Sequence, residues 1–100
     1  MAQIIQQGQY WHIGGEVVFS NASALLETTT TFDNTQPVII DFAQVTNVDT
    51  SAISLMLEWQ RRASAVQSSV SFVNLSPNFM SLANLYGVEE ILAQNITHQT

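Results

Sequence analysis

The stretch VIIDFAQVTNVDTSAISLML, residues 38–57, decides the fold, because an apolar strand, a polar turn and the start of a helix follow one another within it. Its first part, Val38 to Phe42, is a short apolar run rich in β-branched residues and preceded by Pro37. Such a run is typical of a strand covered on both faces, as in a parallel or mixed sheet with helices packed against it. The sequence therefore predicts an α/β fold.

Beyond the polar turn, the period of the apolar residues changes to that of a helix. Apolar side chains recur at spacings of three and four from Ile53 onward, which predicts a helix from about Ser51 to Val66. Asp49, Thr50 and Ser51 stand at its start, and each of them is able to cap the first free backbone N–H groups. Capping is the usual role of such a residue, but a helix start also attracts anions, so a phosphate on Thr50 or Ser51 would find hydrogen-bond donors.

Upstream of this stretch, the chain predicts a hairpin and a first helix. Residues 3–7 and 10–15 are expected to pair around Gly8, with three side chains pointing inward: Ile5, Trp11 and Ile13. Residues 17–19 are expected to continue the sheet or to leave it. A helix capped by Asn21 or Ser23 and running to about Thr31 should follow, with a thin apolar face made by Ala22, Leu25 and Leu26.

Downstream, the chain predicts one more strand and one more helix. Residues 70–74 form an apolar run typical of a strand, and Ser76 followed by proline predicts a capped helix over about 77–86. A last apolar turn or short helix is predicted over residues 88–92. The polar tail, about 94–100, is expected to be frayed.

The composition excludes several classes of function. The chain has no cysteine and no lysine, and its net charge is −6. Without cysteine the chain has no disulfide, thiolate zinc site or cysteine nucleophile. Without lysine it has no Walker A site and no Schiff-base chemistry. Since Arg61 and Arg62 are the only cations, we expect neither nucleic-acid binding nor direct insertion into a membrane. Residues 1–7 lack the basic and long apolar regions of a secretory signal, which favours a cytoplasmic protein.

The polar residues do not form a recognisable catalytic or metal site. His12 and His98 have no second ligand at a suitable spacing, so we expect no metal and no cofactor. Asp41 is expected to order the backbone near the turn rather than to act as an acid or base. A hydrolase built on Thr50 or Ser51 would lack a histidine placed by a known motif, so the sequence predicts no enzymatic activity.

One side of the helix after the turn is a candidate interface. Leu55, Trp59 and Arg62 are spaced i, i+4, i+7 and lie on one face, and tryptophan and arginine are enriched in binding hot spots. The alternative is that Trp59 only covers the edge of the core. Under the interface hypothesis, Ser54 and Glu58 continue the polar row from Thr50, and a partner docked there would contact the turn as well.

The turn itself resembles the central motif of STAS domains, a family that includes anti-sigma-factor antagonists and the C-terminal domains of sulfate transporters. In that family an aspartate and a hydroxyl residue begin a helix, and in the antagonists this hydroxyl is phosphorylated; Asp49 and Thr50 match the two positions. Where the family usually has glycine, this chain has Ser51 and Ala52. The resemblance covers about residues 3–92 and also rests on Gly15-Glu16-Val17, Asn74-Leu75-Ser76-Pro77 and Leu82-Ala83-Asn84-Leu85-Tyr86.

The resemblance implies a fold and two alternative functions. The fold is a single STAS domain over residues 1–100, with a mixed sheet of four strands, or five if a short one is added, and three to four helices. The Leu-Ala-x-Leu-Tyr ending is most similar to the STAS subunits of bacterial phospholipid ABC transporters. It implies a non-enzymatic subunit that binds the transporter's ATPase, in a complex with a permease that maintains outer-membrane lipid asymmetry. The alternative is an anti-sigma-factor antagonist, whose binding to an anti-sigma kinase is switched by phosphorylation of Thr50.

Overall fold

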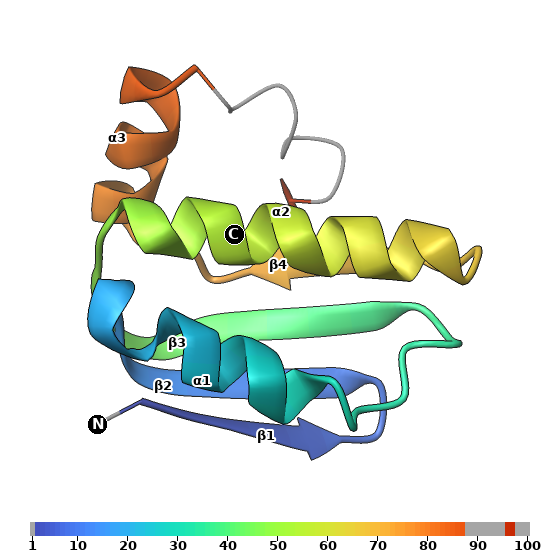
Figure 1. Cartoon of the computed structure of the whole chain (residues 1–100). Coiled ribbons are helices and arrows are strands. Elements are labelled where there is room, and N and C mark those ends of the chain that lie inside the picture. Colours follow the sequence, from blue (N-terminus) through green and yellow to red (C-terminus); the bar gives the residue numbers. More distant parts are fainter. Residues whose placement is uncertain (1, 88–95, 98–100) are drawn as a thin grey trace.

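The protein folds into a mixed sheet with helices packed against it, as the sequence predicts (Figure 1). The structure is a computed structural model and describes residues 2–87 and 96–97. The strands lie side by side in chain order: β1 (Gln3–Gln7), β2 (Tyr10–Val17), β3 (Val38–Val48), β4 (Val70–Val73) and β5 (Ile96–Thr97). β1 is antiparallel to β2, and all later neighbours are parallel. The short β5 is the additional fifth strand that the sequence left open.

Helices connect the parallel strands. They are α1 (Phe19–Thr29), α2 (Thr50–Ala65) and α3 (Pro77–Leu85). Figure 1 shows that α1 and α2 lie side by side on one face of the sheet and begin at the same end of it. Ser76 caps α3, since its Oγ accepts the Phe79 N–H at 3.1 Å, as its position before a proline predicts. Within the described part of the chain, none of the helices is long and apolar enough to cross a membrane.

The N-terminal hairpin forms at the expected residues, but the prediction for one inward side chain was wrong. Gly8 makes the turn with φ of +63°, a conformation that glycine adopts without strain. Trp11 and Ile13 are buried as expected, whereas Ile5 is 56% exposed and Ile4 only 7%. Because side chains alternate along a strand, only one of the two adjacent isoleucines can face the helices. The register pairs Ile4 with Ile13, and this places Ile4 inside.

Helix α1 begins earlier than predicted. Val18 is its N-cap residue, and Phe19 is the first helical residue. Asn21, expected as a cap, instead lies in the first turn, where its Oδ1 accepts the Val18 N–H at 3.0 Å and its Nδ2 donates to the Glu16 carbonyl at 2.9 Å. The helix ends at Thr29, before the predicted Thr31, because the threonine hydroxyls of this run bond to carbonyls of the preceding turn.

Strand β3 is longer than the five residues predicted. It continues through the polar segment after Phe42, because β2 offers a parallel partner along its whole length and pairs Val17 with Val48. The register shifts twice, opposite His12–Gly14 and opposite Gly15–Glu16 of β2, and each shift accommodates one extra residue of β3. The predicted polar connection is therefore part of the sheet, and the turn before α2 shrinks to Asp49.

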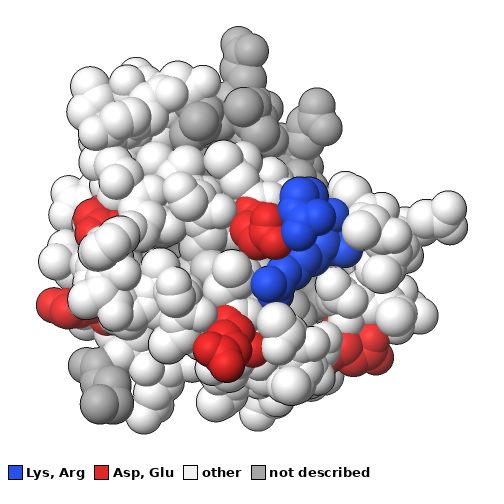
Figure 2. All heavy atoms as spheres, viewed as in Figure 1, with Lys and Arg blue, Asp and Glu red and all other residues white. Residues whose placement is uncertain are grey.

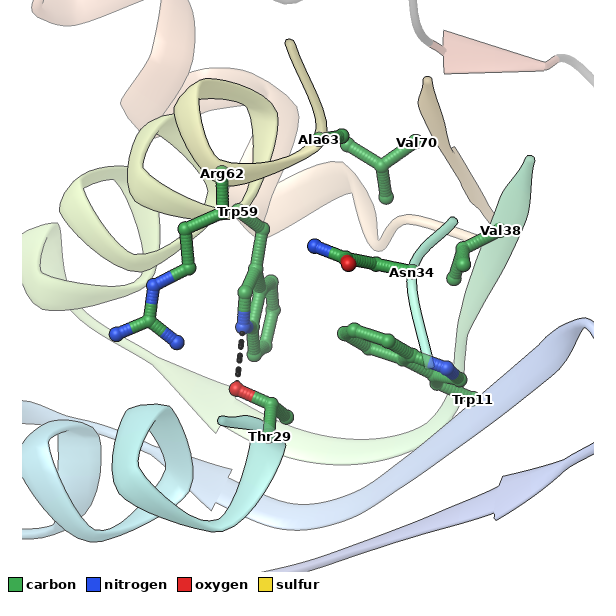
Figure 3. Close-up of a pocket in the computed structure, with 8 residues that line it drawn as sticks. All are labelled: Trp11, Thr29, Asn34, Val38, Trp59, Arg62, Ala63 and Val70. Carbon is green, nitrogen blue, oxygen red and sulfur yellow. Dashed lines mark hydrogen bonds between the residues drawn. The ribbon is translucent and has the colours of Figure 1, made fainter. Parts of the chain in front are cut away.

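Two residues of the predicted interface are part of the core, so the interface prediction was wrong for them. Leu55 and Trp59 are 4% and 3% exposed. Figure 3 shows Trp59 pointing from α2 toward Trp11 and Thr29; its Nε1 donates to the Thr29 Oγ1 at 2.9 Å, and its ring meets that of Trp11 edge to face. The side of α2 that the sequence pattern leaves exposed packs against α1. Helix α1 therefore covers Leu55 and Trp59.

The C-terminal predictions are tested only in part. Residues 88–92, where an apolar turn or short helix was predicted, lie outside the described residues. Within the tail, Ile96 and Thr97 pair with Phe72 and Val73 of β4. The expectation of a frayed tail was therefore wrong for these two residues, because β4 offers them a free edge to pair with.

Candidate partner-binding site at the start of helix α2

Asp49 joins the starts of the two neighbouring helices. Its Oδ1 accepts the Ser51 N–H of α2 at 2.8 Å, and its Oδ2 accepts the Phe19 N–H of α1 at 2.9 Å. Its own N–H donates to the Val17 carbonyl at 3.2 Å. A single carboxylate thus satisfies one free N–H group in the first turn of each helix and fixes the two helix starts relative to each other.

These contacts also determine the charge state of Asp49. Its partial burial raises the pKa, but the hydrogen bonds from the Phe19 and Ser51 N–H groups outweigh this, so the pKa lies below its usual value. Hydrogen bonds to a carboxylate favour the charged form. Asp49 is therefore a fixed negative charge at the helix starts at neutral pH, where it also complements the positive ends of the helix dipoles.

The hydroxyl residues that follow Asp49 are accessible. Thr50 is exposed as the first residue of α2, Ser51 is half-buried, and Ser54 is exposed one turn further along. The sequence left the capping role open among Asp49, Thr50 and Ser51, and the structure gives it to Asp49. The hydroxyl of Thr50 is therefore not needed to cap α2.

A groove of about 320 Å³ runs between α1 and α2 beside these residues. Its lining includes Phe19 and Leu26 from α1 and Ser51, Ser54, Leu55 and Glu58 from α2. Phe19 stands at its end with 84% of its surface exposed. The structure thus brings four predicted site residues together and adds Phe19, which sequence reasoning missed because Val17-Val18-Phe19 has the pattern of a strand end.

Glu58 and the two arginines form a charged cluster on α2. Glu58 accepts hydrogen bonds from Arg61 Nε at 2.8 Å and Arg62 Nε at 3.2 Å, and Arg62 Nη1 donates to the Leu26 carbonyl of α1 at 3.3 Å. Figure 2 shows both arginines beside a carboxylate, with further carboxylates spread over the same face. Arg62, predicted as an interface residue, therefore ties α2 to α1, and both arginines are engaged within the protein.

Because of this charged cluster, the stability of the protein depends on pH. The hydrogen bond from Arg61 is the largest cause that lowers the pKa of Glu58, and together with the hydrogen bond from Arg62 and the positive charges of both arginines it brings this pKa to about 2. Because this folded-state pKa lies below the ordinary value of 4.5 for a glutamate, the stabilisation is present above about pH 4.5 and is lost as the pH falls toward 2. We expect Glu58→Gln to unfold at a slightly lower urea concentration than the wild type near pH 6, since the pair is partly exposed. The two midpoints should converge near pH 2; a constant difference would contradict this assignment.

Asp41 has the structural role that the sequence predicts. Its Oδ1 accepts the Ala43 N–H at 2.8 Å and Asn74 Nδ2 at 2.9 Å, and its Oδ2 lies 3.6 Å from His12 Nδ1. These contacts order the backbone of neighbouring strands. In residues 2–87 and 96–97, no group of three or more His, Asp or Glu side chains is arranged to hold a metal ion. His98 lies outside these residues.

Solved structures of low sequence identity share this fold. The anti-sigma factor antagonist SpoIIAA in its unphosphorylated form is 18% identical, with a TM-score of 0.75, over 100% of this chain and 89% of that chain. A sulfate transporter family protein from Wolinella succinogenes is 18% identical, with a TM-score of 0.71, over 94% and 80%. An anti-sigma-factor antagonist (STAS) domain protein from Planctomyces limnophilus is 16% identical, with a TM-score of 0.69, over 99% and 90%.

The sequence comparisons give the family. A search of curated protein sequences found no match. A family model described as "Mlab, STAS domain" matches residues 6–94, which include both helix starts, the groove and the Asp49 turn. STAS domains are generally non-catalytic binding modules, in agreement with a site made of an exposed hydroxyl and a groove. The chain belongs to the MlaB family of STAS domains.

Proposed function

We propose that this protein is a non-enzymatic accessory subunit of a phospholipid ABC transporter. It binds the MlaF-like ATPase and supports assembly or activity of a complex that includes a permease and maintains outer-membrane lipid asymmetry. In this proposal residues 1–100 form one domain that is cytoplasmic and reaches the inner membrane only through its partner. The observation that carries the proposal is the match to the MlaB family together with an exposed Thr50 next to Ser51, which lines the groove.

The geometry at the start of α2 favours recognition over chemistry. Both oxygens of Asp49 already accept backbone N–H groups, so this carboxylate is poorly placed to remove a proton from Thr50. The same bonds hold the turn in one conformation, which reduces the entropy lost on binding. Beside it, Phe19 offers the kind of exposed aromatic side chain that fills a pocket on a partner.

Substitutions at Thr50 test the proposal. We expect Thr50→Glu to weaken binding to the ATPase encoded with this protein by about tenfold or more, because it adds a charge beside Asp49 at the contact. Thr50→Ala should have a smaller effect of the same sign. The measurement is co-purification followed by ATPase activity. Ser64→Ala is the matched control, since Ser64 is exposed near the other end of α2. Full association and activity of both Thr50 variants would refute the proposed role.

The alternative is an anti-sigma-factor antagonist, and the likeness to SpoIIAA favours it. Under this hypothesis an anti-sigma kinase phosphorylates Thr50, and about −1.5 to −2 units of charge are added beside Asp49, which releases the partner. Incubation with the cognate kinase and ATP should then add one phosphate to the wild type and none to Thr50→Ala, as read by intact mass. Neighbouring genes for an ATPase, a permease and a periplasmic lipid-binding component favour the transporter, whereas a neighbouring sigma factor favours the antagonist.

A further inference from the structure

The outer strand of the sheet lacks the features that usually keep an edge strand unpaired. β1, Gln3–Gln7, is the first strand in the sheet order, so its outer side faces no other described strand. Residues 1–15 contain no Asp, Glu, Lys or Arg, and β1 contains no proline. Its pairing with β2 is regular and has no bulge. Natural proteins protect exposed edges with charges, prolines or bulges, so a regular, neutral edge indicates a strand that takes a partner.

An uncharged groove flanks this edge. It lies between β1 and α1, has a volume of about 440 Å³, and is lined mainly by small and apolar side chains that include Ala2, Ile4, Ile5, Ala24 and Leu25. The remaining lining residues, among them Asn21 and Thr28, are neutral. In a protein with a net charge of −6, such a neutral strip is the place where a second acidic molecule approaches with the least repulsion.

We propose that β1 pairs antiparallel with β1 of a second copy of this chain, so that two sheets join into one. The pair Gln7–Tyr10 closes a two-residue turn, and the alternation of an antiparallel ladder then directs the backbone N–H and C=O groups of Ile4 and Gln6 outward. A twofold axis at Ile5 lets Ile4 of one copy exchange hydrogen bonds with Gln6 of the other. The two Ile5 side chains then lie directly opposite each other on the face away from the helices.

A second copy fits this edge better than a charged partner does. In a twofold pairing both copies use the same edge, so no edge is left for a third copy and the assembly stops at a dimer. In the proposed register every residue opposite another is uncharged: Gln3 meets Gln7, Ile4 meets Gln6, and Ile5 meets Ile5. The backbone carbonyl of Asp33 accepts a hydrogen bond from Gln6 Nε2 at 3.4 Å. The carboxylate of Asp33 instead accepts a hydrogen bond from the Thr35 hydroxyl. The edge is also distinct from the groove between α1 and α2, so a dimer leaves Thr50 and Phe19 accessible.

Cysteine cross-linking tests the register directly, because the chain has no native cysteine. In Ile5→Cys the two thiols face each other across a pair without backbone hydrogen bonds, where Cα atoms are about 4.5 Å apart, a separation that a disulfide spans. We expect mild oxidation of the full chain to give a disulfide-linked dimer. Gln3→Cys and Tyr10→Cys are matched controls on the same face of the sheet, and neither should cross-link, since Gln3 faces Gln7 and Tyr10 lies one strand inward.

Sedimentation of the unmodified protein completes the test. The proposal predicts a monomer–dimer equilibrium in the wild type and a monomer in Ile5→Lys, which would place two ammonium groups opposite each other. A monomer at all concentrations, or equal cross-linking of Ile5→Cys and the two controls, would overturn the proposal. ATPase binding should be unchanged in Ile5→Lys, so the failure of the dimer and the failure of the proposed function are distinguishable.

Discussion

Replacing Asp49 by alanine is expected to lower the free energy of unfolding by about 2 kcal/mol or more, the largest loss of stability that we predict. The substitution removes the acceptor for the Ser51 N–H of α2 and for the Phe19 N–H of α1, so two helix starts lose a hydrogen bond to a charged group. Urea unfolding of the wild type and the variant at neutral pH measures the difference. The loss should fade in acid, because a carboxylate with a lowered pKa stabilises only while it is ionised.

Asp33→Ala is the matched control for Asp49. The carboxylate of Asp33 also accepts a backbone N–H, from Thr35 at 2.9 Å, but both partners belong to one exposed loop. We expect a clearly smaller loss, because no second element is tied by this bond. If the two alanine variants were equally destabilised, Asp49 would be an ordinary local cap and would not join α1 to α2.

Replacing Phe19 by alanine is expected to weaken binding to the ATPase by about thirtyfold, equal to about 2 kcal/mol. Phe19 lies at the end of the groove, next to the Asp49 contact, and is 84% exposed. An aromatic side chain in that position buries a large area when a partner covers it, whereas its removal costs the isolated domain little. Titration calorimetry with the purified ATPase gives the dissociation constant, and urea unfolding shows that the variant is intact.

Leu85→Ala serves as the control for Phe19→Ala. Leu85 is 74% exposed at the end of α3 and does not line the groove between α1 and α2. Its removal should leave the affinity for the ATPase unchanged. Equal losses for the two variants would show that the partner covers a different or much wider surface than the helix starts.

The central strand and the Asp49 turn could be predicted from sequence, because both depend on local patterns. An apolar β-branched run, a change of period and a short polar cap are visible within the stretch 38–57. The end of β3 could not be predicted in the same way. Its polar residues join the sheet because β2 lies beside them, and that pairing partner is distant in sequence.

The surface of the candidate site was harder to predict, because exposure depends on which elements pack together. Trp59 lies outside the apolar stripe of α2, yet α1 covers it and Thr29 satisfies its N–H. Phe19 follows two valines and has the pattern of a buried strand end, yet it begins α1 and is exposed. In both cases a contact between α1 and a distant segment decides the outcome, and a single-helix pattern carries no information about it.

Hydrogen exchange of the wild-type protein with and without the ATPase tests the central claim most directly. We predict that binding slows exchange of the backbone amides in the first turns of α1 and α2, around residues 18–22 and 50–54, where helix-start N–H groups lie next to Thr50 and Phe19. The amides of β1 and α3 should exchange as before. Protection confined to β1 or α3, with no change at the two helix starts, would contradict the account.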